Sequence, residues 1–359
     1  MSLGNNLIWA AAKALSPTEQ DRAWFRGQKK APPAAPAGTE RRNGPGRPRR
    51  AAVAMVLRLE LVSSDRPKFP SVDSLISHIA SAREAVPARG GSELGTETLL
   101  IRRAVNQRDP WSGHVALPGG RQEWGEEDLE TAVRECEEEV GAKLKPGRFA
   151  LLGRLRERRT SRGDKGLAVS CLVFVQLDYS SEVVLTPDPK EVAHAWWANN
   201  GLFFPRHSPQ TVGHPLHKYF PAARKTPWKF LAWILGVDTV FFPCFYLPPA
   251  IPPPHQAVPE EESNGAEAAV VAAAQGKGAG AAANACVGFV LWGLTFGMVS
   301  DLVVAAGAPP FARPPPYFMF RNPVANLLLA WWYCCLDPLL RSLSRSLGQS
   351  STHSRRELE

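Results

Sequence analysis

The stretch LPGGRQEWGEEDLETAVRECEEEVG, from Leu117 to Gly141, decides how the rest of the chain is interpreted. Apolar residues recur in its second half at helical spacing: Leu129, Ala132, Val133, Cys136 and Val140. This spacing predicts a helix with one apolar side. Acidic residues open the helix, where negative charge suits the backbone dipole, and Gly141 stands where a left-handed C-cap ends a helix. We therefore expect one long helix, entered through a loop that contains a glycine pair.

Three carboxylates gather on the other side of this predicted helix. Glu135, Glu138 and Glu139 are spaced i, i+3, i+4, so they share one patch about a turn apart. Like charges at this spacing repel one another, and a bound divalent cation makes such a cluster favourable. A solvent-exposed acidic face is the alternative. The loop favours the cation, because Gly119 and Gly120 give a backbone that can approach a ligand closely.

The fixed residues of the loop and helix resemble the Nudix box, G-x5-E-x7-R-E-U-x-E-E-x-G-U. Every position of the box is filled, with small apolar residues at the two U positions: Gly120, Glu126, Arg134, Glu135, Cys136, Glu138, Glu139, Gly141 and Ala142. The resemblance implies an α/β class fold, the Nudix α/β/α sandwich with a mixed sheet. It also implies a hydrolase that uses Mg²⁺ or Mn²⁺ to neutralise phosphate oxygens and activate water.

The resemblance assigns roles to the charged residues of the box. We expect Glu135 and Glu139 to be metal ligands, and Glu138 to be the third ligand or the catalytic base that activates water. Arg134 has two structural alternatives, since it can pair with Glu126 to hold the loop against the helix or balance its acidic neighbours. Gly119 and Gly120 are expected to let the backbone approach the metal and the diphosphate.

The residues before the box resemble a further signature, that of the coenzyme A diphosphatase branch. Leu99–Arg103 reads LLIRR and Arg108–Gly120 reads RDPWSGHVALPGG, against a pattern of roughly LLTKR followed by R-x-H-x-G-x-V-x-F-P-G-G. The chain departs from that pattern in having Trp111 near the usual His, one added residue before Gly113, and Leu117 in place of Phe. The resemblance implies hydrolysis of coenzyme A or acyl-coenzyme A to 3′,5′-ADP and (acyl-)phosphopantetheine.

Several residues outside the helix are candidates for contact with the substrate: Arg102, Arg103, His114 and Arg158. Arg158 belongs to a basic loop that could meet a phosphate such as the 3′-phosphate of coenzyme A, with a charged strand edge as the alternative. For His114 the alternative is a structural hydrogen bond. Glu191 is a further candidate base, with an exposed glutamate in a turn as the preferred interpretation.

Two other functions compete with a coenzyme A diphosphatase. One is a Nudix hydrolase of another nucleoside diphosphate derivative, such as NADH or ADP-ribose. The other is a non-catalytic module that binds nucleotides or membranes, which the complete set of box glutamates argues against. The expected partner is a small nucleotide-like molecule. Nucleic acid is not expected, and membrane association is not favoured.

Composition and pattern suggest how the chain is organised. Its 359 residues carry a net charge of +8, but ten basic and three acidic residues fall in the first fifty, so much of the excess belongs to a tail. The cysteines show no metal-type spacing, which favours a reducing compartment. We predict the following segments: a disordered tail or transit peptide (1–50), the Nudix core (51–205), a partly disordered insertion (206–285), a closing strand and helix (286–308) and a tail (309–359).

Two apolar runs near the C-terminus are relevant to whether the protein contacts a membrane. Residues 286–308 are long enough to span a membrane, but resemblance to the closing segment of the coenzyme A diphosphatase branch favours a buried strand and helix. Residues 323–335 are too short to span, and an interfacial position is the alternative. We predict a cytoplasmic or organellar location (mitochondrion or plastid). A peroxisomal location is not expected, because the terminal RRELE is not a peroxisomal address.

Overall fold

The computed structural model describes twelve parts of the chain: residues 7–25, 49–60, 66–85, 95–106, 112–160, 166–203, 210–216, 226–247, 289–305, 307, 319–320 and 322–331. The chain separates into two compact units. The larger unit takes residues 1–208 and 245–310, and the smaller takes residues 209–244 and 311–359. The loop and helix of the box lie in the larger unit.

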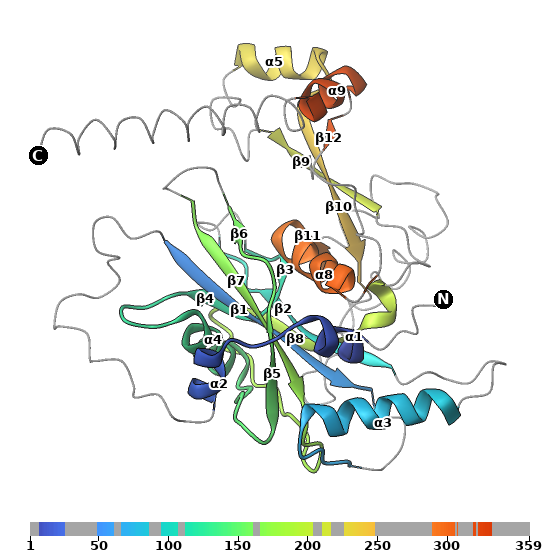
Figure 1. The fold of residues 1–359 in the computed structure, drawn as a ribbon. Helices are drawn as coiled ribbons and strands as arrows, with labels where there is room; N and C mark the ends of the chain where they lie inside the picture. The colour runs from blue at the N-terminus through green and yellow to red at the C-terminus, as the bar shows by residue number, and fades with distance from the viewer. Residues whose placement is uncertain are drawn as a thin grey trace, which may run out of the picture. The chain divides into compact units, whose positions relative to one another are not determined.

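An eight-stranded mixed sheet forms the centre of the larger unit (Figure 1). Its main path follows the order β3 (Val115–Ala116), β2 (Thr96–Arg103), β1 (Arg50–Leu59), β7 (Ala168–Gln176) and β5 (Phe149–Arg154). Three more strands each pair with one of these: β4 (Gly119–Arg121) with β1, β6 (Arg158–Arg159) with β7, and β8 (Val192–Asn199) with β2. β1 and β7 run parallel, and the other described pairs of this sheet are antiparallel. Every residue of β7 is buried, as expected for a central strand covered on both faces.

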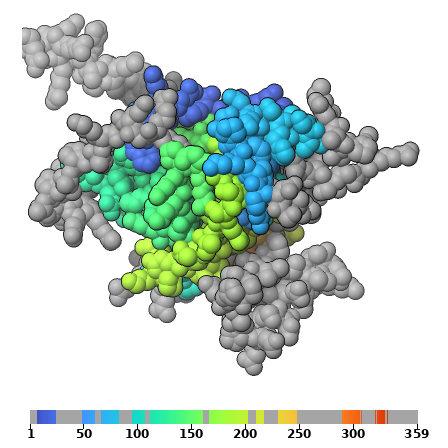
Figure 2. Space-filling model, turned by 90° about the horizontal axis from the view of Figure 1, so that it is seen from below, coloured from blue at the N-terminus to red at the C-terminus, as the bar shows by residue number. Residues whose placement is uncertain are grey.

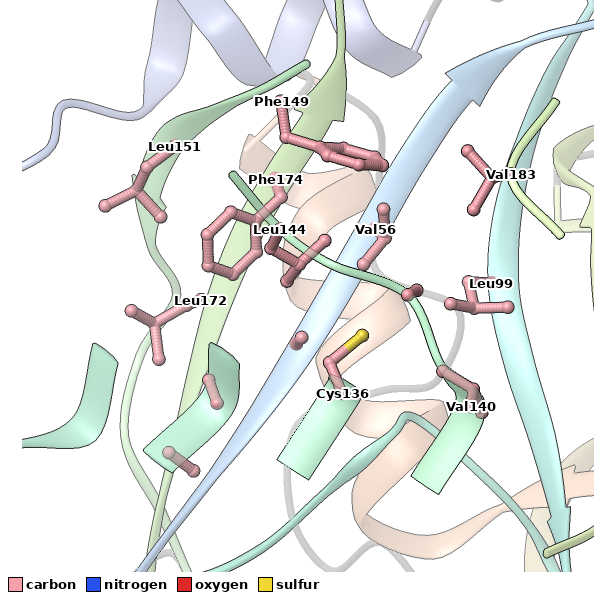
Figure 3. Close-up of a cluster of buried hydrophobic side chains, with 14 of the residues drawn as sticks. Val56, Leu99, Cys136, Val140, Leu144, Phe149, Leu151, Leu172, Phe174 and Val183 are labelled. Carbon is pink, nitrogen blue, oxygen red and sulfur yellow. The ribbon is translucent and has the colours of Figure 1, made fainter. Parts of the chain in front are cut away.

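Helix α4 (Asp128–Val140) packs its apolar side against one face of this sheet. Cys136 and Val140 lie over Phe174 and Leu99 of the strands (Figure 3). Glu127 and Glu130 form a capping box at the start of the helix, and Gly141 ends it in the left-handed conformation, with φ 72°. The helix that the sequence predicts therefore forms, with both of its ends fixed.

The opposite face of the sheet carries α8 (Gly293–Ala305), which follows the short strand β11 (Val290–Trp292) (Figure 3). Arg158 of β6 ties α8 to the sheet through Asp301 and the Gly297 carbonyl. Helices thus cover both faces of a mixed sheet, and the predicted α/β/α sandwich is confirmed.

The first described residues depart from the sequence-based prediction. Instead of a disordered tail, residues 7–25 form α1 (Leu7–Ala14) and α2 (Glu19–Phe25), with α1 contacting α8 and α3 (Val72–Ala85). In Figure 2 the N-terminal residues, in dark blue, lie against α3 in light blue. Leu7, Ile8 and Ala11 are buried there. Residues 7–25 are thus helical and bury an apolar side on the core, whereas the sequence led us to expect a disordered tail or a transit peptide over residues 1–50.

Two residues of β5, Gly153 and Arg154, contact this N-terminal segment. Gly153 has φ 150°, and a side chain there would press on Leu15 and Ser16. The guanidinium of Arg154 pairs with the buried carboxylate of Asp21. Residues 26–48, which complete the predicted tail, lie outside the described residues.

The smaller unit joins parts of the predicted insertion and the predicted C-terminal tail. β9 (Gln210–Pro215) pairs antiparallel with β10 (Thr239–Tyr246), and β12 (Met319–Phe320) pairs with β10 at Val240 and Phe241. Two helices accompany these strands, α5 (Thr226–Ile234) and α9 (Pro323–Trp331). Residues 248–288, which hold the rest of the insertion, lie outside the described residues.

Among the described residues, none of the helices combines the length and the apolar character needed to cross a bilayer.

Candidate metal centre

Three glutamates from two elements come together beside the glycine loop. Glu135 and Glu139 lie one turn apart on α4, and Glu191 directly precedes β8. One carboxylate oxygen from each lies within 4.8 Å of the other two. Glu139 is buried, Glu135 is half-buried and Glu191 is exposed, so the group has a covered side and an open side. Carboxylate oxygens are the donors that hard divalent cations prefer.

The end of β2 fixes the backbone that carries Glu191. The Glu191 carbonyl accepts a hydrogen bond from the amide of Ala104 at 2.8 Å, and its own amide donates to the Asp188 carbonyl at 3.0 Å. One residue later, Val192 pairs with Arg103 in the sheet. Glu191 thus reaches the site because β8 pairs with β2, more than eighty residues earlier in the chain.

The glycine pair makes room for the glutamates of α4. The amide of Gly119 donates to Glu139 Oε2 at 2.8 Å. A Cβ on Gly120 would overlap the Glu135 carboxylate, and one on Gly119, where φ is 151°, would overlap the backbone of Ala52 and Val53. Only glycine therefore lets the loop lie this close to the helix.

Burial and mutual repulsion make these carboxylates costly to ionise together. The pKa of Glu139 is raised to about 8, mainly by burial and also by the charges of Glu135 and Glu191, against the lowering effects of the Gly119 amide and Arg103. Burial also raises the pKa of Glu135, against the nearby charge of Arg134. A divalent cation would offset this repulsion, so the donor set fits Mg²⁺ or Mn²⁺.

Arg134 fills both of the structural roles considered for it. It holds Glu126 through Nε at 2.6 Å and Nη2 at 3.0 Å, which fixes the loop to the helix. Its Nη1 donates to Glu135 at 3.1 Å and to Glu138 at 2.8 Å. Glu138 is therefore paired with Arg134 and mostly exposed, and it lies outside the group of three. Its role as ligand or base stays a prediction.

A family model matches the part of the chain that holds this site. Residues 86–214 match the model of the NUDIX domain. Residues 86–214 are a NUDIX domain. The match covers the glycine loop, α4 and Glu191, and it confirms the family predicted from the box. It does not distinguish the coenzyme A diphosphatase branch from others.

A curated relative and several solved structures share the NUDIX region. An uncharacterised protein of Schizosaccharomyces pombe is 37% identical over 113 residues, which are 31% of this chain and 29% of that protein. A MutT/nudix family protein from Enterococcus faecalis is 15% identical, with 51% of each chain covered and a TM-score of 0.27. For an Ap4A hydrolase from C. elegans the identity is 16%, the coverage 52% of this chain and 98% of that one, and the TM-score 0.27. The chain thus spans less than a third of the curated relative and about half of the Enterococcus protein.

The candidate substrate residues of the NUDIX domain separate into different environments. Arg103 lies near enough to Glu139 for its charge to lower the pKa of that carboxyl. Arg102 lies over the ring of Phe289 at 5.4 Å, and His114 Nδ1 accepts a hydrogen bond from Trp292 Nε1 at 3.1 Å. Arg158 is engaged with Asp301 and the Gly297 carbonyl of α8, and its role as a substrate contact stays a prediction.

Sequence reasoning underrated one residue of the group, Glu191. The sequence favours an exposed glutamate in a turn at this position, with a catalytic base as the alternative. The structure shows it to be exposed and also part of the carboxylate group. Its place immediately before a strand was the available signal, but the pairing of that strand with β2 is not visible in local sequence.

Proposed function

We propose that the NUDIX domain hydrolyses a phosphoanhydride bond of a small nucleotide derivative. The observation that carries this proposal is the convergence of Glu135, Glu139 and Glu191 beside a glycine loop. These residues would hold Mg²⁺ or Mn²⁺. When bound, such an ion supplies positive charge to the phosphate oxygens and makes water more acidic.

Residues around the carboxylate group would position the loop, accept a proton and add positive charge. Gly119 and Gly120 let the loop lie directly against β1 and the Glu135 carboxylate, so the loop borders the group that would hold the ion. We propose that Glu191, on the open side of the group, uses the carboxylate oxygen that does not hold the ion to accept the proton of the attacking water, with Glu138 as the alternative base. The water oxygen forms a bond to one phosphorus atom, the P–O bond of the anhydride at that phosphorus breaks, and the other phosphate leaves with the bridging oxygen. Arg103 adds positive charge on the same side as Glu139.

We further propose coenzyme A or acyl-coenzyme A as the substrate, cleaved to 3′,5′-ADP and (acyl-)phosphopantetheine. The support is the signature-like LLIRR sequence, which forms the end of β2 and ends next to Val192 and Glu191. NADH and ADP-ribose are the alternatives. Arg108 and Trp111, the other residues of the signature that bear on this choice, lie outside the described residues.

The test is hydrolysis of a panel with Mg²⁺ or Mn²⁺: coenzyme A, acetyl-coenzyme A, NADH, ADP-ribose and 8-oxo-dGTP. We expect 3′,5′-ADP from the first two, measured by chromatography. Glu139→Gln should abolish its release. Glu137→Gln is the matched control, because Glu137 lies on the same helix but pairs with Lys143 outside the site. Cleavage of another nucleotide alone would refute the substrate, and no cleavage at all would refute the activity.

A further inference from the structure

Helix α9 of the smaller unit presents its apolar side to solvent. Val324, Leu327, Leu328 and Trp331 are spaced i, i+3, i+4, i+7, so they form one stripe, and they are 60%, 70%, 63% and 56% exposed. The side turned inward includes Ala325 and Asn326. A surface helix of a soluble protein normally has the reverse arrangement, with its apolar stripe on the core.

Helix α5 shows the same inversion. Phe230, Trp233 and Ile234 are 63%, 61% and 58% exposed, whereas the small residue Ala232 is buried. The rings of Phe230 and Trp233 stack on each other, with centroids 6.1 Å apart, and so form one apolar surface. Exposed apolar residues that occur singly are ordinary, but a group on adjoining helices marks an interaction surface.

Specific hydrogen bonds hold the two helices to each other. The Asn322 carboxamide oxygen accepts from the Val324 amide at 2.8 Å, which caps α9, and its Nδ2 donates to the Leu235 carbonyl at the end of α5 at 2.8 Å. Asn326 exchanges two hydrogen bonds with the Phe320 backbone and so ties α9 to β12. Within this unit both helices lie at the same end of the β9–β10–β12 strands (Figure 1). Their exposed residues therefore belong to a built surface.

The charge of the smaller unit indicates what covers this surface. Residues 209–244 and 311–359 contain ten lysines and arginines against four aspartates and glutamates. Helices α5 and α9 themselves contain no acidic residue. Exposed leucine, phenylalanine and tryptophan side chains, in a unit with more basic than acidic residues, are features of helices that lie in a membrane interface. Excess positive charge attracts anionic headgroups and repels a second copy of the chain.

We propose that the smaller unit is a peripheral membrane-binding module that lays α5 and α9 on an anionic phospholipid surface. Each helix has nine residues and is therefore about 14 Å long, less than half of the roughly 30 Å hydrocarbon core, so it lies along the surface. The apolar stripe enters the boundary between headgroups and acyl chains, and the net positive charge of the unit attracts the anionic headgroups. The sequence indicated only an interfacial position for residues 323–335 as an alternative, and the part played by α5 was not visible because the two helices are almost ninety residues apart.

The experiment is flotation of the full-length protein with vesicles of phosphatidylcholine and phosphatidylserine at 70:30, and with phosphatidylcholine alone. We expect flotation with the anionic vesicles at low salt, weaker flotation in 0.5 M NaCl because salt screens the headgroups, and little with the neutral vesicles. The double variant Trp233→Glu/Leu327→Glu should lower the bound fraction at least tenfold. Val184→Glu is the matched control, since Val184 is 68% exposed but lies in the larger unit.

The variants test the surface only if they stay folded, which circular dichroism and the thermal midpoint show. If the double variant unfolds, the milder pair Leu327→Ser/Leu328→Ser makes the same test. Absence of flotation by the wild type, or equal flotation by the surface variant, would overturn the proposal. So would a wild-type dimer, seen by light scattering without vesicle binding and lost in the variant, because the surface would then join two copies of the chain.

Discussion

Arg134 donates to Glu126 through two nitrogens and to Glu135 and Glu138 through a third. The pair with Glu126 gives the loop a fixed position on α4. The bond to Glu138 draws that carboxylate away from Glu139 and leaves Glu191 to complete the group. At the scale of single residues, the composition of the site thus depends on Arg134, which pairs with Glu138, as well as on the three grouped carboxylates.

This arrangement predicts different effects for two glutamate variants. Glu191→Gln should weaken Mn²⁺ binding by about tenfold or more, because it removes one of three grouped carboxylates. Glu138→Gln should weaken it less, since Glu138 is paired with Arg134 outside the group. Electron paramagnetic resonance of free Mn²⁺ during a titration measures both affinities. Glu137→Gln serves as the control on the same helix. A larger loss for Glu138→Gln than for Glu191→Gln would show that the sequence-based ligand set is the better one.

The glycine loop gives a second prediction at this scale. Gly120→Ala should abolish tight Mn²⁺ binding while the protein stays folded, because the new methyl group would displace the Glu135 carboxylate. Gly147→Ala is the matched control: φ is 82° at Gly147, so the backbone is strained there, but no atom lies within 4 Å of the new Cβ. It should lower the thermal midpoint and leave Mn²⁺ affinity unchanged. Equal Mn²⁺ affinity in the two variants would contradict this account of Gly120.

At the scale of elements, α2 contacts the start of the helix that carries the site. Gln20 donates to Glu127 at 2.6 Å and Trp24 donates to Glu130 at 2.9 Å, so α2 contacts both members of the capping box of α4. Arg154 joins Asp21 of α2 to Asp128, the first residue of α4. The N-terminal segment is therefore part of the support of the NUDIX domain.

Loss of the Asp21 carboxylate should reveal this support. Asp21→Ala leaves Arg154 without its buried partner and should lower the free energy of unfolding by roughly 2–3 kcal/mol. This is somewhat less than the loss for a fully buried pair, because Arg154 still pairs with Asp128 and is partly exposed to solvent. Urea unfolding at neutral pH measures the change. The exposed Glu19→Ala is the control in the same helix. A change below about 0.5 kcal/mol would mean that α2 adds nothing to the core.

The same elements show where sequence-based prediction works and where it ends. Helix α4 and strand β7 follow from apolar spacing within one segment, and the glycine loop follows from a motif of 23 residues. The position of α2 depends on an ion pair between Asp21 and Arg154, 133 residues apart. Glu191 depends on the pairing of β8 with β2. The smaller unit depends on the pairing of β10 with β12. The position of α2, the role of Glu191 and the smaller unit are therefore not evident from local sequence, because in each case the pairing partner lies far away in the chain.

At the scale of the whole molecule, several buried carboxylates are held ionised by arginines on other elements. Burial acts to raise the pKa of Asp21, but hydrogen bonds from Arg154 and Thr18 and the charge of Arg154 lower it overall. The pKa of Asp128 is lowered in the same way, by Arg50, Ser170 and Arg154 against the effect of burial. These contacts join the N-terminal segment, β1, β5 and α4, so their titration reports on how the larger unit is held together.

The direction of these shifts fixes how stability depends on pH. A carboxyl whose pKa is lower in the folded protein binds fewer protons there than in the unfolded chain, so its stabilisation is present above the unfolded pKa and is lost as pH falls through the folded pKa. The unfolded reference for an aspartate is 3.8. The contribution of Asp21 should therefore be complete at pH 6 and decline below about pH 4.

A comparison of Asp21→Asn with the wild type isolates that contribution. Urea unfolding at pH 6 should show the variant to be the less stable of the two, since a neutral amide cannot pair with Arg154. The difference should shrink steadily as pH falls from about 4 to 2.5, because the Asp21 carboxyl of the unfolded wild-type chain takes up a proton there, whereas the folded one, whose pKa is lowered, resists protonation. If the difference instead stays constant across this range, the variant acts through packing at a buried position, and the ion pair with Arg154 does not hold α2 on the core.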